Sequence, residues 1–391
     1  MKRRSRYLAA ATLGLALFAA ACGDDSDTEA EPSTPAADGG SGGGGGLADV
    51  CPNPIVIQKD WLAEIEHAPV YQLIGPDGKM SENTYEGEIG DTGVTLRIID
   101  GGPGLGEGQT VISSLFTGNL KTNEMPTLAF VMTNDAAVFS EQFPVVGVVS
   151  PLRKSPQMIF WDPATYPDGF ETVDDLIEFA KTGNKIYVGS IAETFGKWLV
   201  DEGVPESAFI EGYAGDAENF VTNGGKWLNQ GYSSNEKWDF ENGRGWEKPI
   251  DYVYVSDLGF DYYPSVLSVA KDKLEELSPC LELLVPMIQQ ATVDYVTDPT
   301  PINEMLEKYN EEGHGAAYWK TPLELNEAGF EVMIEDELIG NENGSIGGFD
   351  MARVQKTIDN VKSGFDDRAN PDVKAEDIAT NQFIDESIAL P

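Results

Sequence analysis

The residues with chemical potential in this 391-residue sequence gather just after short apolar segments that predict β-strands. A residue that follows a parallel strand lies at the sheet edge where α/β proteins bind ligands. Nine such residues are our candidate ligand-binding residues: Asp60, Trp61, Glu64, His67, Thr133, Asn134, Asp135, Ser190 and Tyr232. Aromatic rings can stack on flat heterocycles, and carboxylates can hold amino groups. These residue types therefore predict ligand binding.

Each candidate also has a purely structural interpretation. Trp61 and Tyr232 could be core residues, and His67 could be a hydrogen-bonded structural histidine on a helix. Asn134 and Asp135 could simply cap a helix. Ser190 opens a predicted helix, whose free N–H groups could hold an anionic or polar group or could be capped without any ligand. The sequence leaves these alternatives open.

Enzyme signatures are missing from the sequence. It contains no G-x-x-x-x-G-K-[ST] phosphate loop, no G-x-S-x-G elbow and no H-E-x-x-H motif, and the glycines between Gly102 and Gly108 do not fit G-x-G-x-x-G. Two histidines exclude a three-histidine zinc site, and three cysteines exclude a cysteine-rich metal site. We therefore expect no catalytic residues, no metal and no cofactor, and a protein that is not an enzyme.

The formal net charge is −40, with 66 acidic residues against 26 Lys and Arg. So strong a negative field repels phosphate backbones and excludes nucleic acid as the expected partner. The charge does not identify what is bound, because a self-repelling soluble surface, such as one suited to a saline habitat, has the same composition.

The N-terminus predicts export. Residues 1–21 have a basic start, an apolar run and small residues, as a secretory signal does. The sequence Ala-Ala-Ala-Cys at 19–22 resembles the bacterial lipobox, which implies cleavage before Cys22 and lipidation of its thiol. An ordinary secretory signal with an incidental cysteine is the alternative. Residues 22–46 are rich in Gly, Ser and acids and predict a flexible linker. We expect a folded domain tethered by lipid to the outer face of the cytoplasmic membrane.

Two cysteines, Cys51 and Cys280, remain after Cys22. In an oxidising compartment we expect them to form one disulfide. Two separate buried thiols are the alternative.

Strand and helix patterns alternate along the rest of the chain. Strands are predicted at 54–59, 93–100, 126–132, 145–152, 157–161, 185–188, 227–232 and 251–255, and helices at 61–73, 111–120, 173–182, 192–202, 219–224, 271–285, 286–295, 302–311 and 349–361. Thr172 to Asp175 forms a capping-box pattern. The alternation predicts an α/β fold with mostly parallel sheets.

Extended segments at 145–161 and 262–270 bracket a unit of about a hundred residues. This arrangement fits two α/β lobes joined by two crossings, with a ligand cleft between them. We expect residues 47–150 and 265–391 to form the first lobe and residues 151–264 the second.

One run of residues resembles a known family. Asp60-Trp61, Glu66-His67 and Tyr71 are similar to the opening of the nitrate, sulfonate and thiamine-precursor branch of ABC-transporter solute-binding proteins. Residues 146–158 and 259–271 are similar to the hinge strands of that branch. The resemblance implies the type II periplasmic-binding-protein fold, together with ABC permease and ATPase partners.

The resemblance also implies site roles. Trp61 and His67 would belong to the first-lobe wall, Thr133 and Asn134 would be polar groups of the cleft, and Ser190 and Tyr232 would come from the second lobe. Few Lys or Arg residues lie near these candidates, which favours a neutral or cationic heterocycle.

We therefore expect a monomeric lipoprotein that captures a small organic solute, such as a thiamine-precursor-like heterocycle, and delivers it to a permease. One alternative is a small anion such as an alkyl sulfonate or nitrate. Others are a pyrimidine-synthase-like enzyme and a surface interaction protein without a ligand.

Overall fold

The computed structural model describes residues 46–391, except 103–109, 120, 244, 363 and 366–367. The predicted signal segment, Cys22 and the linker up to residue 45 lie outside the described residues.

Seven strands form the first sheet. Their order is β2 (Lys79–Ser81), β3 (Thr84–Glu88), β4 (Thr95–Ile99), β1 (Ile55–Gln58), β5 (Leu128–Phe130), β12 (Leu267–Ala270) and β6 (Val145–Val149). β1 is parallel to β4 and β5 and is buried along its whole length, as its unbroken apolar start predicts.

Five strands form the second sheet. Their order is β11 (Asp251–Tyr254), β7 (Gln157–Trp161), β10 (Leu228–Tyr232), β8 (Ile186–Val188) and β9 (Phe209–Glu211). A third, two-stranded sheet joins β13 (Asn341–Glu342) and β14 (Ser345–Ile346).

Both large sheets are mixed, so the expectation of mostly parallel sheets is wrong. β12 runs antiparallel to β5 and β6, and β7 runs antiparallel to β10 and β11. β7 and β12 are the strands that receive the chain when it passes from one sheet to the other, so they enter from the opposite end. β2 and β3 form a hairpin that the sequence analysis misses, and Asn83 lies in its turn with φ of 57°.

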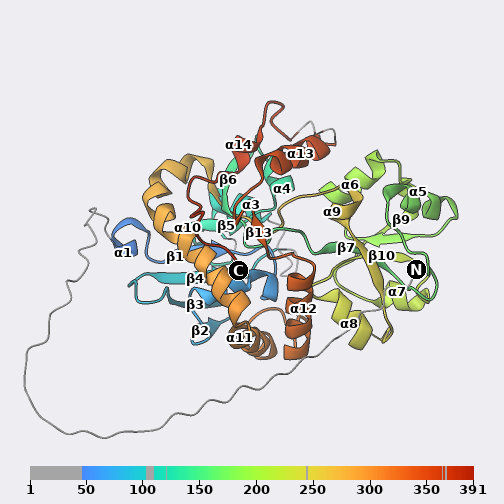
Figure 1. Cartoon of the computed structure of the whole chain (residues 1–391), viewed down its shortest axis with the longest axis horizontal. Helices are drawn as coiled ribbons and strands as arrows, with labels where there is room; N and C mark the ends of the chain where they lie inside the picture. Colours follow the sequence, from blue (N-terminus) through green and yellow to red (C-terminus); the bar gives the residue numbers. More distant parts are fainter. Residues whose placement is uncertain (1–45, 103–109, 120, 244, 363, 366–367) are drawn as a thin grey trace, which may run out of the picture. The chain divides into compact units, whose positions relative to one another are not determined.

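Helices cover the two large sheets. They are α1 (Leu47–Val50), α2 (Ala68–Gln72), α3 (Val111–Thr117), α4 (Thr133–Val138), α5 (Val173–Lys181), α6 (Thr194–Asp201), α7 (Glu218–Thr222), α8 (Glu236–Asn242), α9 (Val255–Leu258), α10 (Leu274–Thr297), α11 (Thr300–Glu311), α12 (Leu323–Glu335), α13 (Met351–Lys362) and α14 (Ala375–Ile378). Short 3-10 turns are η1 (Ile65–His67), η3 (Glu206–Ala208) and η4 (Lys271–Lys273). In Figure 1, α10 lies beside the strands of the first sheet, and α5 to α8 surround those of the second.

The chain passes between the two large sheets twice. The first crossing joins β6 to β7 through residues 150–156, and the second joins β11 to β12 through residues 255–266. Arg353 on α13 contacts both crossings: its guanidinium donates to the Asp261 carboxylate and the Tyr262 carbonyl, and it also donates to the Arg153 carbonyl. The crossings are thereby tied to one helix.

Two helix predictions are wrong at their ends. Residues 61–64 are not helical, because helical structure begins only at Ile65 in η1 and Pro69 stands in the first turn of α2. The two helices predicted at 271–285 and 286–295 form one helix, α10, which begins at Leu274 and contains Pro279 and Pro286. A proline removes one backbone hydrogen bond, and the buried face of α10 supplies enough packing to continue the helix.

Two local features follow the sequence closely. α5 begins with the capping box, in which Thr172 accepts from the Asp175 N–H and Asp175 accepts from the Thr172 N–H. Cys51 and Cys280 form a disulfide between residues 229 positions apart. It joins the segment before β1 to the buried face of α10.

Candidate functional site

The segment after β1 places several charged side chains where that strand ends. His67 Nε2 lies 2.8 Å from Asp60 Oδ1, and His67 Nδ1 lies 3.7 Å from Glu64 Oε1. The imidazole packs edge-on against Phe130 of β5, with ring centroids 4.8 Å apart. Burial lowers the pKa of His67 below its ordinary value, although the hydrogen bond to Asp60 acts in the opposite direction. His67 is therefore a neutral, fixed group.

Trp61 is half-buried at the end of the same strand. Its ring packs edge-on against Trp319, with centroids 5.8 Å apart and an interplanar angle of 81°. Trp319 is held in turn because its indole N–H donates to the Ala63 carbonyl. Because Trp61 is only half-buried, it can pack against Trp319 and still stack on a ligand.

The start of α4 follows β5. Thr133 exchanges hydrogen bonds with Tyr263 of the second crossing, so it fixes the backbone there. Asn134 Nδ2 donates to Thr194 Oγ1 at the start of α6, over 2.6 Å. Asn134 therefore links the first-sheet side to the second-sheet side.

The second-sheet side contributes the turn between β10 and α8. Ser234 Oγ donates to Glu66 Oε1 over 2.5 Å, and Asn235 Nδ2 donates to Glu64 Oε2 over 3.2 Å. Glu236 accepts from the Tyr232 N–H and the Tyr213 hydroxyl, which fixes the turn. Side chains of the two sides thus contact each other directly.

Five acidic side chains from both sides form what we call the acidic cluster. They are Asp60, Glu64, Glu66, Asp135 and Glu193. Glu64 and Glu66 are buried, Asp60 and Asp135 are half-buried, and Glu193 stands exposed at the rim. The electrostatic influence of Asp60 on Glu64, Glu66 and Asp135, and of Glu193 on Asp135, shows that they share one neighbourhood.

Desolvation dominates the protonation of the acidic cluster. Burial raises the pKa of Glu66 to about 8, and burial, with Glu193 and Asp60 nearby, raises the pKa of Asp135 to about 7. The pKa of Glu64 is also raised, first by burial and then by Glu66 and Asp60. Like charges held together out of water favour the neutral acids. At neutral pH the cluster therefore holds protons.

Known proteins were compared with the chain. No protein-family model matches the sequence, and no curated protein matches it. Solved structures match it along most of its length. The alkanesulfonate-binding protein SsuA from Xanthomonas axonopodis pv. citri, bound to MOPS, has a TM-score of 0.51 at 12% identity, and the match covers 84% of this chain and 99% of that chain.

Two further structures match the chain in the same way. The periplasmic aliphatic sulphonate binding protein SsuA from Escherichia coli gives a TM-score of 0.50 at 12% identity, and the match covers 83% of this chain and 94% of that chain. The periplasmic nitrate-binding protein NrtA from Synechocystis PCC 6803 gives a TM-score of 0.52 at 10% identity, covering 85% of this chain and 88% of that chain. The chain has the periplasmic-binding-protein fold. At these identities the likeness concerns the fold alone.

Within this fold, most of the sequence-predicted site residues lie together. Tyr232 lies beside Glu66 and Glu193, whose charges add to the effect of burial in raising its pKa. Thr133 lies behind Asn134 against Tyr263, and Trp61 follows Asp60 in the chain. The residues in or against the acidic cluster are Asp60, Glu64, His67, Asn134 and Asp135.

Ser190 is the exception among the predicted residues. Its hydroxyl donates to Glu211 at the end of β9, over 2.9 Å, and Glu211 also accepts from the Ile191 N–H. This arrangement caps the start of the segment before α6. The Ser190 side chain therefore points to Glu211. The nearby Glu193, in contrast, is a member of the acidic cluster.

The predicted binding residues do not include Glu66, Ser234 or Glu236. Glu66 lies in η1, two positions after Glu64, which is extended just before that turn. Ser234 is 168 residues away from Glu66. No local signal connects them, although the polar run after β10 does indicate a loop there that could contact a ligand.

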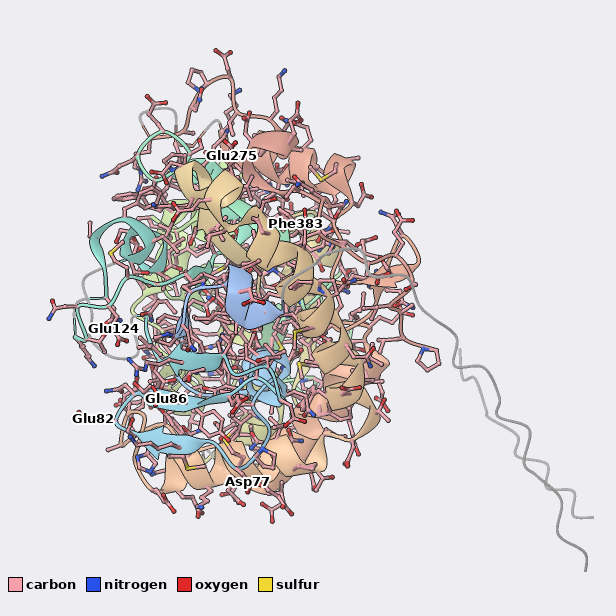
Figure 2. The ribbon with its side chains drawn as sticks, turned by 90° about the vertical axis from the view of Figure 1, so that its left-hand side faces the viewer. Asp77, Glu82, Glu86, Glu124, Glu275 and Phe383 are labelled. Carbon is pink, nitrogen blue, oxygen red and sulfur yellow. A yellow bond between two sulfur atoms is a disulfide. The ribbon has the colours of Figure 1, made fainter. Side chains whose placement is uncertain are left out.

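Two cavities lie at the outer edge of the first sheet. One of about 400 Å³ is lined by Glu82, Asn83, Ile99, Asp100, Lys121 and Thr122, and a second of about 200 Å³ is lined by Lys79, Ser81, Thr84, Glu86, Arg97, Thr122 and Glu124. Figure 2 shows Glu82, Glu86 and Glu124 on this edge. Arg97 forms ion pairs with both Glu86 and Glu124 in the second cavity.

In the described part of the chain, no group of three or more His, Cys, Asp and Glu residues is placed to hold a metal ion. No helix within it is both long enough and apolar enough to cross a membrane.

Proposed function

We propose that this chain is the extracytoplasmic solute-binding lipoprotein of an ABC importer. The observation that carries the proposal is the acidic cluster, whose carboxyls lie in segments that follow strands of both sheets and accept hydrogen bonds from the turn after β10. A site divided in this way can open and close around a ligand. No bond is made or broken in this function.

The finer parts of the proposal rest on the sequence. Residues 1–21 would be removed, Cys22 would carry lipid, and residues 22–46 would tether the domain outside the cytoplasmic membrane. Residues 47–150 with 265–391 and residues 151–264 would be two lobes that move about the crossings. A monomer would capture its solute and dock on the permease, whose ATPase drives import.

The preferred solute is a small heterocycle that carries amino groups, of the thiamine-precursor type. Trp61 is only half-buried and would stack on a flat ring, and the neighbouring carboxyls would accept its N–H groups. A small anion is the second candidate, since the proteins named above bind sulfonates and nitrate. The raised pKa values of Glu66 and Asp135 support it, because a protonated carboxyl can donate to an anion.

A melting-temperature screen tests the proposal. The panel contains thiamine and its pyrimidine precursors, riboflavin, taurine and other sulfonates, nitrate and amino acids. A ligand at about a hundred times its dissociation constant stabilises the protein by about 2.7 kcal/mol, which raises the melting temperature by several degrees. A shift with one chemical class supports solute capture. The absence of any shift contradicts it for these solutes.

The variant Trp61→Ala tests the stacking role. We expect it to weaken binding of the solute that the screen finds by about 1–3 kcal/mol, because a stacked ring is lost. Trp227→Ala is the matched control, because Trp227 is also half-buried but lies just before β10, at the opposite end of that strand from Tyr232. Equal affinity in Trp61→Ala and the unmodified protein would remove Trp61 from the site.

A further inference from the structure

Two hydrogen-bond acceptors that lack a donor lie against the acidic cluster. A carboxylate can only accept, so His67 donates to Asp60 from Nε2 and its Nδ1 is left as an acceptor. That nitrogen is buried in a side chain with 2% exposure, has no hydrogen-bond partner and lies 3.7 Å from Glu64 Oε1. A buried acceptor without a donor is costly, and here it is aimed into the cluster.

Asn134 repeats the pattern on the other side of the cluster. Its Nδ2 donates to Thr194, and its Oδ1, in a side chain with 3% exposure, is buried without a partner. Asp135 follows it in the chain, and Glu193 precedes Thr194. When the carboxyls of the cluster are ionised, both unsatisfied atoms need an N–H or O–H group that the described residues do not supply.

The acidic cluster also has few positively charged neighbours. Among the residues that the structure describes, no Lys or Arg forms an ion pair with any of the five acids of the cluster. Lys59, whose charge acts on Glu64, is itself buried against Asp100 at 2.7 Å. Arg368, whose charge acts on Asp135, has its guanidinium over the Phe365 ring, 4.8 Å from the centroid.

We propose, on the basis of the function proposed above, that the solute presents a protonated amine or an amidinium group to the acidic cluster. Its N–H groups would donate to Glu64 and Glu66 and to the unpartnered Nδ1 of His67. Charge-assisted hydrogen bonds of this kind are short and roughly twice as strong as neutral ones. The cation would also relieve the repulsion among carboxyls held together at the meeting of the two sheets.

When the cationic solute binds, the carboxyls of the acidic cluster would release protons. Glu66 faces Ser234, Asp60 and Glu236, and Asp135 faces Glu193, Asp60 and Arg368. A bound cation favours the ionised carboxyls, so a cationic solute competes with protons and binds more tightly as pH rises from about 6 to about 8. An anion that accepts hydrogen bonds from the protonated acids would instead bind more weakly as pH rises.

The test uses probes that share a skeleton and differ in charge: benzamidine, benzamide and benzoate, and propylamine, propionamide and propionate. Each is added at millimolar concentration to the purified protein, and the melting temperature is measured at pH 6, 7 and 8. We expect benzamidine or propylamine to raise it, more at pH 8 than at pH 6, and the neutral and anionic members to leave it unchanged.

Three variants locate the effect. Glu64→Gln and Glu66→Gln keep the side-chain shape and remove one charge each, and we expect either to weaken binding of the cation at least tenfold. Glu275→Gln, on the exposed first turn of α10, is the control and should leave the shift intact. Circular dichroism confirms that each variant is folded.

The remaining outcomes separate the two proposals. Shifts only with neutral or anionic probes would overturn the cationic solute and leave solute capture standing. A cation shift that survives both Gln variants would place binding elsewhere and overturn the assignment. If Ca²⁺ alone raised the melting temperature as much as the amine probes, and Glu64→Gln and Glu66→Gln abolished that shift, the cluster would be a metal site. That result would also overturn the proposal of a cationic solute. No shift with any probe here or in the screen above would count against both proposals.

Discussion

Glu66 and Asp135 are two carboxyls whose protonation differs between the folded and the unfolded chain. Their pKa values rise from ordinary values of 4.5 and 3.8 to about 8 and about 7. At these two positions the folded chain therefore binds more protons than the unfolded chain between the ordinary and the raised pKa values. The contribution of these two carboxyls to the free energy of unfolding therefore falls as pH rises from about 4 to about 8, by up to about 1.4 kcal/mol per pH unit for each carboxyl.

The variant Glu66→Gln should flatten this pH dependence. The amide that replaces the Glu66 carboxyl can still accept from Ser234 but does not titrate, so the variant should exceed the unmodified protein in stability at pH 8. Urea unfolding at pH 5, 6, 7 and 8 measures the effect, with Glu275→Gln as control. Parallel pH profiles for Glu66→Gln and the unmodified protein would show that Glu66 is ionised in the folded state.

Helix α12 packs unusually closely on the β10–α8 turn. A Cβ atom placed on Gly329 would lie 2.0 Å from the Ser234 carbonyl oxygen and 2.6 Å from Ile65 Cδ1. Ser234 is the residue that donates to Glu66. The absence of a side chain at Gly329 therefore lets α12 pack directly against the turn that holds Ser234 beside Glu66.

The variant Gly329→Ala should force α12 away from that turn. We expect a loss of about 1–3 kcal/mol in the free energy of unfolding, because overpacking displaces backbone on both sides. Glu327→Ala is the control, since Glu327 is exposed on the same helix. Urea unfolding measures both. A Gly329→Ala protein as stable as the control would mean that the helix can shift without cost.

Elements with strong local signals are predicted well from the sequence. β7 has the predicted bounds, and α5 begins at its predicted capping box. The errors occur where tertiary contacts override local preference, as at Pro286 inside α10. The hairpin of β2 and β3 is missed because its strands are short and half-exposed and lack apolar alternation.

The disulfide between Cys51 and Cys280 restrains the chain as a whole. It spans 229 residues and joins the start of the described chain to α10. A cross-link of this kind reduces the freedom of the unfolded chain, and its loss typically costs about 2–4 kcal/mol.

The double variant Cys51→Ser/Cys280→Ser should therefore unfold at lower urea concentration than the unmodified protein. Reducing agent should have the same effect on the unmodified protein and none on the variant, which serves as its own control. If the variant and the oxidised protein unfold at the same midpoint, the bond does not stabilise the fold.

Local chemistry in the sequence was enough to predict an α/β chain, its alternating elements and a set of polar residues at strand ends. Apolar runs, capping boxes and turn residues act over a few positions, so they can be interpreted without the fold. The direction in which a side chain points cannot be predicted without the fold. Ser190 turns to Glu211, whereas Glu66 meets Ser234 from the other sheet. Only the packing of segments far apart in the chain brings these carboxyls together out of water, and that burial, which no local pattern encodes, determines their protonation and the charge of the ligand that we propose.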